Sequence, residues 1–431
     1  MDELAIQGGP KMGNDHYSAN KLVCALAVAC AATNAHCVES DFPVIRVGLV
    51  SMGSHERLKL TSEGDFGVCD PRSPEFFGWW KANTNAMVIA EGDQVRVGDK
   101  LYPAVYFSSS GPWIKLMGPK TARRYRGWLH FTARKGKLIA VNELPLEMYL
   151  MGVIPCEMPP SWHPEALKAQ AIAARTYTIG KIGAFVGQGY DVDDTTRCHT
   201  YKGVDAEDPR SSEAVRVTSN QIIMYAGRPI EALYATVSGG VTADASESFN
   251  GSGLPYLRSI RDLDAKGRPY AAESKHYYWT KEYTAQQLSA ALSKRGRLGG
   301  LQQLMVEGKG PSGRVLSVRA VGDAGELNFT GQDLRRLLGP DAIRSALFHI
   351  QRTEVGWKFA GKGWGHGVGM CQAGANGRAN SGQTYDQILK AYYTGVEIIR
   401  VAGSPIELSS RSSRVDRRKF SKDWRDGDRG K

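Results

Sequence analysis

The stretch that decides the fold runs from Asn142 to Tyr177 and reads NELPLEMYLMGVIPCEMPPSWHPEALKAQAIAARTY. Its second half is rich in Ala, Leu, Gln, Lys and Arg, which have high helix propensity, so we predict a helix over residues 165–180. Ser161 is the predicted N-cap, and Pro164 falls in the first turn, where its missing N–H costs little.

The residues before this helix hold one conspicuous carboxylate, Glu157, between prolines. Pro155, Pro159 and Pro160 fix φ and remove N–H donors, so we predict that Glu157 lies in a rigid turn outside any helix. A partly desolvated carboxyl group held in this way can donate a proton. Glu165, the next carboxylate, is explained as a first-turn acid at a helix N-terminus. The pattern therefore indicates an enzyme built around a single acid.

Two cations of the predicted helix, Lys168 and Arg175, are seven residues apart and so share one face. Near Glu157 they could bind polar groups of a substrate. A cation beside Glu157 would lower its pKa, so desolvation must be the larger effect if Glu157 is to act as an acid. The pattern is equally typical of a core helix after a turn, with both cations solvated.

Two glycine-rich segments follow later in the chain. Residues 361–375 read GKGWGHGVGMCQAGA and include His366 and Gln372, while residues 234–243 read YATVSGGVTA. Glycine is needed where φ is positive or where the backbone approaches another group closely, so the first segment can form a flat surface for a polar polymer, while the second is predicted as a strand that ends in a Ser-Gly-Gly turn. The alternatives are a tight structural loop and a plain turn.

These segments together resemble the stage II sporulation protein D (SpoIID) family, which includes the amidase-enhancer LytB group. The similar motifs occur in family order and span about residues 125–400. They are NELPLEMYLMGVIP (142–155), EMP (157–159), EALKAQAIAARTY (165–177), DTTRCHTY (194–201), SGG (238–240) and GWGHGVGMCQAGA (363–375).

The resemblance implies a peptidoglycan lytic transglycosylase, which cleaves glycan strands at N-acetylmuramic acid and leaves 1,6-anhydro ends. Such an enzyme can work with one carboxylate, because the C6 hydroxyl of the sugar replaces the water that a hydrolase activates with a second one. By resemblance Glu157 is the catalytic acid and base. The substrate-binding residues implied are Lys168, Arg175, Tyr201, Ser238, Gly239, Gly240, His366 and Gln372.

Partners and alternatives follow from the same resemblance. The implied partners are peptidoglycan glycan strands, including strands stripped of stem peptides, and a cell-wall amidase. A non-catalytic glycan-binding enhancer of such an amidase is the alternative function, and a hydrolase that leaves reducing ends is a third. No nucleic-acid partner is expected, because the chain has no basic motif interleaved with aromatic residues.

No cofactor and no metal are expected. Some relatives bind zinc near the DTTRC segment, but here the segment offers only Cys198 and His199, and adjacent residues rarely ligate one ion. Cys371 and Cys156 stand where family members commonly have small residues such as Ser or Ala. Together with Cys69 and Cys198 they permit disulfides, but the sequence leaves the pairing open.

Both ends of the chain have unusual composition. Residues 21–37 combine a Lys, a short apolar run and small residues, so we expect a signal peptide and an exported protein of the periplasm or cell-wall space, with membrane association through this segment as a further option; a buried helix is the alternative. The net charge is +11, of which residues 409–431 supply +5, and the low apolar content there predicts disorder. A basic balance suits anionic wall polymers.

The expected fold class is α+β, with mixed β elements packed on the Ala-rich helix and a β-rich N-terminal module. The expected divisions are an export segment (1–37), a β-rich module (38–120), a SpoIID-like catalytic region (121–403) and a basic tail (404–431). Strands are predicted at 44–50, 86–90, 94–97, 103–107, 125–132, 137–141, 221–225, 230–237, 315–321 and 396–401, with a hairpin turn at Lys135 and Gly136. Further helices are predicted at 211–218, 284–295, 330–338 and 384–393.

Overall fold

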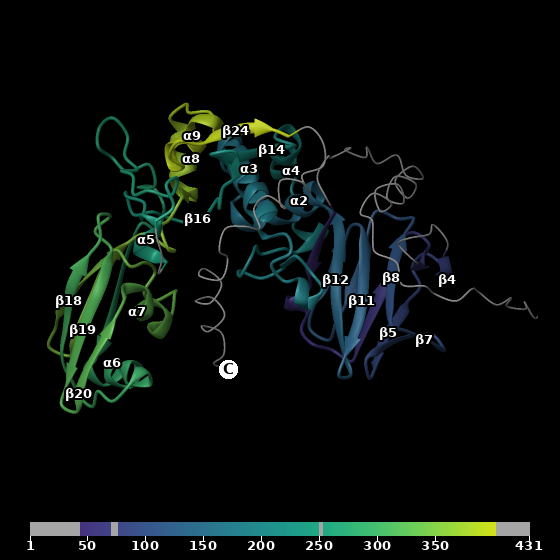
Figure 1. Cartoon of the computed structure of the whole chain (residues 1–431), viewed down its shortest axis with the longest axis horizontal. Coiled ribbons are helices and arrows are strands. Elements are labelled where there is room, and N and C mark those ends of the chain that lie inside the picture. The colour runs from purple at the N-terminus through teal and green to yellow at the C-terminus, as the bar shows by residue number, and fades with distance from the viewer. Residues whose placement is uncertain (1–43, 70–75, 250–252, 402–431) are drawn as a thin grey trace, which may run out of the picture.

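The computed structural model describes residues 44–69, 76–249 and 253–401. The predicted export segment and basic tail lie outside these residues. The described chain forms a β-rich N-terminal part, a central group of helices and a lobe at the far end from the first part (Figure 1). Strands and helices are both abundant, so the predicted α+β class is confirmed. None of the helices in the described ranges is long and apolar enough to span a membrane.

The N-terminal part consists of two packed sheets. One has the strand order β13-β1-β12-β11-β8-β3-β4 and the other β10-β9-β2-β5-β6-β7. Alternate residues of these strands are buried, such as Ile45 and Val47 in β1, and both sheets contribute to one core. The strand bounds are β1 Val44–Gly48, β2 Arg57–Thr61, β3 Phe66–Cys69, β4 Phe76–Trp80, β5 Ala86–Glu91, β6 Gln94–Val97, β7 Lys100–Tyr102, β8 Ala104–Ser109, β9 Ile114–Met117, β10 Ala122–Tyr125, β11 Trp128–Arg134, β12 Lys137–Pro145 and β13 Val192–Asp193.

The predicted hairpin around Lys135 and Gly136 is present. Both residues have positive φ, 52° and 73°, as a two-residue hairpin turn requires. It joins β11 to β12, which pairs in turn with β1. The boundary predicted between residues 120 and 121 falls between the paired strands β9 and β10, so these sheets contain strands from both sides of it.

The prediction that Glu157 lies in a turn outside any helix is wrong. Leu146–Glu157 forms helix α2, with Pro155 inside its last turn and Glu157 as its final residue. A proline so close to the end removes one hydrogen bond, while the helix buries Tyr149, Leu150 and others against the core.

The Ala-rich helix is confirmed as α3, Pro164–Lys181. Its N-cap is His163 rather than Ser161, because the His163 side chain accepts a hydrogen bond from the Glu165 N–H and Pro164 follows as the first helical residue. Small residues such as Ala171 and Ala174 are fully buried, and α3 contacts α2, α4 (Pro209–Val217), α8 (Gln372–Asn380) and α9 (Tyr385–Tyr392). The small side chains therefore let four helices pack closely around one.

The remaining elements of the centre bring distant segments together. Strand β16 pairs in parallel with β23, and β14 pairs with β24 near the end of the described chain. The predicted strand 230–237 shortens to the two residues of β16, since its flanks bend into the glycine-rich turn. The bounds are α4 Pro209–Val217, β14 Gln221–Tyr225, β15 Arg228–Pro229, β16 Tyr234–Ala235, α5 Ala245–Ser248, β23 Met370–Cys371, α8 Gln372–Asn380, α9 Tyr385–Tyr392 and β24 Glu397–Arg400. The single-turn 3-10 helices are Val50–Met52, Val186–Gln188 and Gly203–Ala206.

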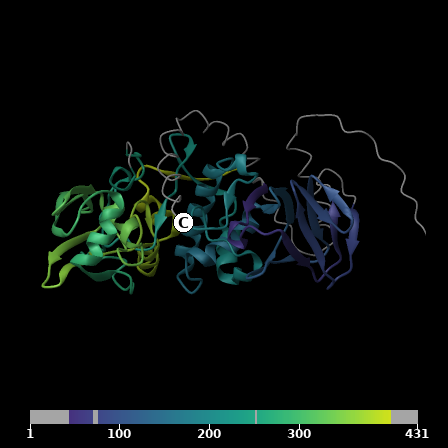
Figure 2. The same cartoon turned by 90° about the horizontal axis from the view of Figure 1, so that it is seen from below.

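The lobe between β16 and β23 in sequence has a hydrophobic core of its own, which includes Val318, Ala320 and the aromatic residue Phe359. Two three-stranded sheets, β17-β22-β21 and β18-β19-β20, pack with two helices in this lobe (Figures 1 and 2). The bounds are β17 Tyr278–Thr284, α6 Ala285–Leu292, a 3-10 turn Ser293–Arg295, β18 Leu301–Lys309, β19 Val315–Gly322, β20 Gly325–Phe329, α7 Gly331–Leu338, β21 Phe348–Arg352 and β22 Gly356–Lys362. Residues 278–362 are called the inserted lobe below.

Candidate active site

Glu157 ends helix α2, and its side chain is partly buried. The Thr200 N–H donates to Glu157 Oε1 over 3.3 Å, and the Gln372 side-chain amide donates to the Glu157 carbonyl oxygen over 2.9 Å. Desolvation raises the pKa of Glu157 to about 7, and the hydrogen bond from Thr200 opposes that rise. Desolvation is the larger effect, as the single-acid hypothesis requires, so the carboxyl group can hold a proton near neutral pH.

Aromatic side chains surround this carboxyl group. Tyr149, Tyr177 and Tyr234 all lie close enough for the charge of Glu157 to raise their pKa values further, beyond the larger effect of burial. His199 stacks on Tyr234 and lies 3.2 Å from the Tyr149 hydroxyl through Nδ1. Burial lowers the pKa of His199 to about 3, so the imidazole is neutral.

Two polar atoms of this cluster have no hydrogen-bond partner among the described residues: the Tyr234 hydroxyl and His199 Nε2. The Gln170 side-chain nitrogen, near Gln372, also has no hydrogen-bond partner among the described residues. Buried polar groups normally have partners, so unpaired ones mark positions where water or a ligand group can bind. The surroundings of Glu157 thus combine one protonatable acid with several free hydrogen-bonding atoms.

The two cations predicted on one helix face have different environments. Lys168 is partly exposed and pairs with Glu165 over 2.7 Å, one turn away. Arg175 is fully buried, makes two hydrogen bonds to Glu147 of α2 at 2.7 and 2.8 Å, and also donates to the carbonyls of Gln221 and Val215. Arg175 is therefore a core residue, and its prediction as a substrate ligand is corrected. Lys168 as a ligand stays a prediction.

Glu165 has the role expected of a first-turn acid. Its carboxylate accepts from Lys168 and from the Tyr385 N–H over 2.7 Å, and these contacts hold its pKa below the usual range against desolvation. It remains ionised near neutral pH. Glu165 is therefore ionised near neutral pH whereas Glu157 can be protonated, although the two are only eight residues apart.

Tyr201 and Gln372 also support the structure. Tyr201 is buried and donates its hydroxyl to Asn142 Oδ1 over 2.8 Å, which corrects its prediction as a direct ligand. Gln372 is 4% exposed and begins helix α8, where it contacts the Glu157 backbone and Gln170. The structure thus brings Gln372 to Glu157, in a position to orient the acid rather than to cover a substrate.

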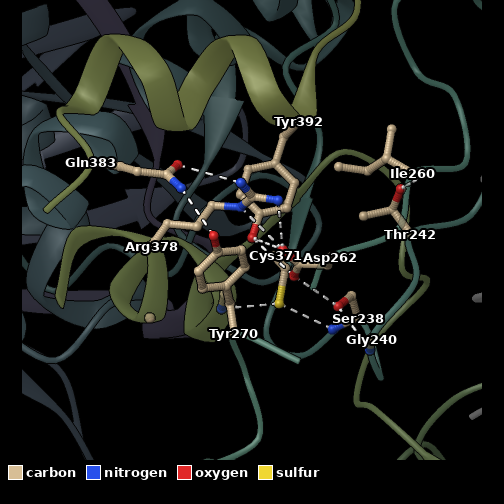
Figure 3. A network of polar contacts seen from close by, with 12 residues as sticks. Ser238, Gly240, Thr242, Ile260, Asp262, Tyr270, Cys371, Arg378, Gln383 and Tyr392 are labelled. Carbon is tan, nitrogen blue, oxygen red and sulfur yellow. Dashed lines mark hydrogen bonds and ion pairs between the residues drawn. The ribbon is translucent and has the colours of Figure 1, made fainter. Parts of the chain in front are cut away.

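The Ser-Gly-Gly turn is fixed by a buried polar network centred on Asp262 (Figure 3). Asp262 is fully buried and accepts from the Ser238 hydroxyl at 3.1 Å, from the Tyr392 hydroxyl at 2.8 Å and from Arg378 at 3.1 Å. Ser238 is 1% exposed, so its prediction as a direct ligand is corrected too. Gly239 and Gly240 have φ of 79° and 94°, which explains glycine at both positions; Gly240 is partly exposed.

Cys371 joins this network to helix α8. Its sulfur accepts hydrogen bonds from the Ser238 N–H at 3.1 Å and the Gly374 N–H at 3.2 Å, so it caps the helix (Figure 3). Burial raises the pKa of this thiol to about 12, which makes it unreactive. Cys156, Cys198 and Cys371 are all free thiols. Within the described ranges, Cys198 and His199 gain no third side chain to form a metal-binding group.

His366 lies in the glycine-rich loop, partly exposed, beside Phe249. Its Nδ1 accepts from the Val368 N–H over 3.0 Å, and its carbonyl oxygen accepts from the Ser248 hydroxyl. Burial of the ring lowers the pKa of His366 to about 4, so it is neutral near pH 7. Its role as a ligand stays a prediction.

Sequence reasoning missed four residues of this region. Thr200 and His199 lie inside the DTTRCHTY motif, so that motif was the available signal, although only Tyr201 was chosen from it. Tyr234 precedes the Ser-Gly-Gly turn and was assigned only to a strand. Asp262 lies in a polar segment with no motif of its own, and only the tertiary contacts identify it.

The fold and site define an α+β protein with one partly buried acid at a helix end, which Gln372 of the later glycine-rich segment contacts. Comparison with known sequences places the chain among known protein families. A family model described as "Stage II sporulation protein" matches residues 134–225, and one described as a domain of unknown function matches residues 264–369, which cover the whole inserted lobe.

Curated relatives extend the match over more of the chain. An uncharacterised protein of Brachyspira hyodysenteriae is 35% identical over 279 residues, covering 64% of this chain and 72% of the relative. Stage II sporulation protein D of Bacillus subtilis is 34% identical over 278 residues, covering 60% of this chain and 76% of the relative. The amidase enhancer of Bacillus subtilis is 30% identical over 301 residues, but only 40% of its length is covered. The chain belongs to the stage II sporulation protein D family.

Proposed function

We propose that this protein acts on the cell wall as a peptidoglycan lytic transglycosylase, with Glu157 as its single acid and base. The observation that carries the proposal is the protonatable carboxyl of Glu157, with a pKa of about 7, among unpaired polar atoms. The similarity to a sporulation protein and to an amidase enhancer supports a cell-wall role. We further propose that the protein is exported, in keeping with the composition of residues 21–37.

The proposed reaction needs no water and no second carboxylate. Glu157 gives its proton to the glycosidic oxygen, and the bond from that oxygen to C1 of N-acetylmuramic acid breaks. The N-acetyl group of the same sugar stabilises the positive charge that develops at C1. The C6 hydroxyl then forms a new bond to C1, and its proton returns to Glu157. The products are a 1,6-anhydro end and a free hydroxyl on the neighbouring sugar.

The chain's own residues supply the conditions for these steps. The tyrosine cluster excludes water from Glu157, which keeps the acid protonated. Gln372 and Thr200 hold the helix end and the carboxyl group in place. The unpaired Tyr234 hydroxyl and His199 Nε2 are buried, so they can hydrogen-bond only a group that reaches beneath the surface.

The test is mass spectrometry of purified peptidoglycan, intact and amidase-treated, after incubation with the protein. We expect 1,6-anhydro-N-acetylmuramic acid ends from the parent chain and a loss of at least about 100-fold in Glu157→Gln, as for removal of a general acid. Glu165→Gln is the matched control, a carboxylate on the next helix, and should retain cleavage. Reducing ends in place of anhydro ends would instead establish a hydrolase.

The second candidate is a non-catalytic enhancer of a cell-wall amidase, which the similarity to the Bacillus subtilis amidase enhancer favours. In that case the parent chain would release no glycan product from either substrate. It would instead raise the rate at which an added amidase releases stem peptides, and Glu157→Gln would do so equally well.

A further inference from the structure

Two shallow hollows, open to solvent, lie along the edge strand β17 of the inserted lobe, with volumes of about 600 and 450 Å³. Tyr278, Trp279 and Thr280 line both of them, so we call them the β17 cavities. Neither includes Glu157, and nothing in the reaction described above uses them. Their size suits one or two sugar rings rather than a whole protein segment.

The β17 cavities begin at the two glycine-rich segments. Gly239 of the Ser-Gly-Gly turn lines the smaller cavity. Arg344 lines the larger one, its guanidinium lies 5.0 Å from the Trp364 ring centre in the glycine-rich loop, and its carbonyl oxygen accepts from the Gly365 N–H. A polymer that runs along these two segments would therefore continue directly into the β17 cavities.

The aromatic lining is of the kind that sugar rings contact. Tyr278 is 68% exposed, and the Lys362 ammonium lies 5.6 Å from its ring centre. The apolar face of a pyranose ring packs against such an exposed aromatic face, while the polar edges remain free for hydrogen bonds. Trp279 is 6% exposed, and its buried indole Nε1 has no partner among the described residues, so it is an unsatisfied donor just behind the lining.

The charge of the lining is positive. Lys309 and Lys362 line the smaller cavity, and Lys281 and Arg344 line the larger one. None of these four forms an ion pair with a carboxylate in the described part of the chain, while Asp341 is the acidic residue in the lining. The inserted lobe as a whole has 13 Lys and Arg against 7 Asp and Glu, a net charge of +6. Such a surface attracts an anionic ligand.

We propose that the β17 cavities bind a carboxylate-bearing stretch of glycan at a distance from the bond that Glu157 cleaves. The aromatic residues would contact the sugar rings, and Lys309 and Lys362 would pair with lactyl carboxylates that carry no stem peptide. The identity of the glycan rests on the proposed function, whereas the binding of an acidic saccharide rests on the cavities alone. The inserted lobe would then hold and align the strand while the centre of the molecule acts on it.

The experiment measures binding by calorimetry in the full chain carrying Glu157→Gln, with two soluble saccharides of equal length. One is a neutral N-acetylglucosamine oligomer, and the other alternates N-acetylglucosamine with peptide-free N-acetylmuramic acid. We expect about tenfold tighter binding of the acidic oligomer at low salt, and loss of that preference in the Lys309→Ala, Lys362→Ala double variant. Tyr278→Ala should weaken both oligomers several-fold, because stacking does not depend on charge.

Lys358→Ala is the matched control, because Lys358 is an exposed lysine on the same strand as Lys362 but does not line either cavity. Equal affinity for the two oligomers, or equal effects of the control and the double variant, would overturn the proposal. The proposal would also be overturned if a polyglycerol phosphate displaced the acidic oligomer at lower concentration, since the ligand would then be a phosphate polymer.

The two proposals fail separately. If the parent chain releases no anhydro ends but the lysine-dependent preference is found, the proposed function is wrong and the cavity assignment stands. If anhydro ends form while the double variant binds and cleaves acidic strands like the parent chain, the cavity assignment is wrong and the proposed function stands.

Discussion

At the scale of single residues, the chemistry of Glu157 depends on its surroundings more than on its sequence neighbours. Glu157 and Glu165 are the same residue type eight positions apart, yet desolvation raises the pKa of the first to about 7, while Lys168 and a backbone N–H hold that of the second low. The prolines that drew attention to Glu157 predicted a turn, but Glu157 ends a helix, and its role as the acid stays a prediction.

The raised pKa of Glu157 predicts a one-sided pH profile. The carboxyl must be protonated to donate, so cleavage should fall as pH rises through about 7, by about tenfold per pH unit well above it. The same group takes its proton back, so Glu157 imposes no loss on the acidic side. Initial rates across pH, with folding monitored by circular dichroism, test this. An acidic limb in a folded protein would indicate a second catalytic carboxylate and contradict the single-acid mechanism.

At the scale of elements, buried polar pairs hold the site's helices and turns together. Arg175 and Lys168 share a helix face, but their surroundings differ. Helix α4 and strand β14 cover the end of α3 that carries Arg175, whereas the end that carries Lys168 lies beside α9. The result is that Arg175 fastens α3 to Glu147 of α2, the helix that carries Glu157. Asp262 likewise joins the Ser-Gly-Gly turn to helix α8, because it accepts hydrogen bonds from Ser238 and Arg378 (Figure 3).

The buried pair predicts a large effect of Arg175→Met on stability. Loss of the guanidinium leaves the Glu147 carboxylate buried without its ion-pair partner, which should lower the free energy of unfolding by about 3–5 kcal/mol. The double variant Glu147→Leu, Arg175→Met should recover much of that loss, because no unpaired charge remains. Urea unfolding measures both. A stable Arg175→Met protein with weakened glycan binding would restore Arg175 as a substrate ligand.

At the scale of the whole molecule, the described residues form two hydrophobic cores, one shared by the N-terminal sheets and the central helices and one in the inserted lobe. Polar contacts join them: Arg314 of the lobe donates to the carbonyls of Ser238 and Val241, and Ser312 contacts Glu247. The lobe is thus fixed directly to the Ser-Gly-Gly turn, and it lies at the opposite end of the molecule from the N-terminal sheets (Figure 1).

The two cores predict two unfolding transitions in calorimetry. Phe359→Ala, in the lobe core, should lower the midpoint of one transition, and Phe107→Ala, in the N-terminal core, should lower the midpoint of the other. Each variant should reduce the free energy of unfolding of its own part by about 3–5 kcal/mol. Tyr278→Ala, on the lobe surface, serves as the control and should move neither. If both core variants shift a single transition together, the cores unfold as one cooperative unit.

The sequence by itself determined the family, the α+β class and the Ala-rich helix, because these depend on local composition and on motifs that are contiguous in the chain; Glu157 as the acid stays a prediction of the same motifs. Thr330 and Thr384 as helix caps were predictable for the same reason, since a capping box spans only four residues.

Only the tertiary structure decided which polar residues are accessible. Arg175, Tyr201 and Ser238 carry groups that could bind a sugar, but each is buried against partners far away in sequence, at Glu147, Asn142 and Asp262. Burial depends on which elements pack together, and a local pattern does not contain that information. The pKa of Glu157, the network at Asp262 and the separate core of the inserted lobe all follow from the same long-range packing.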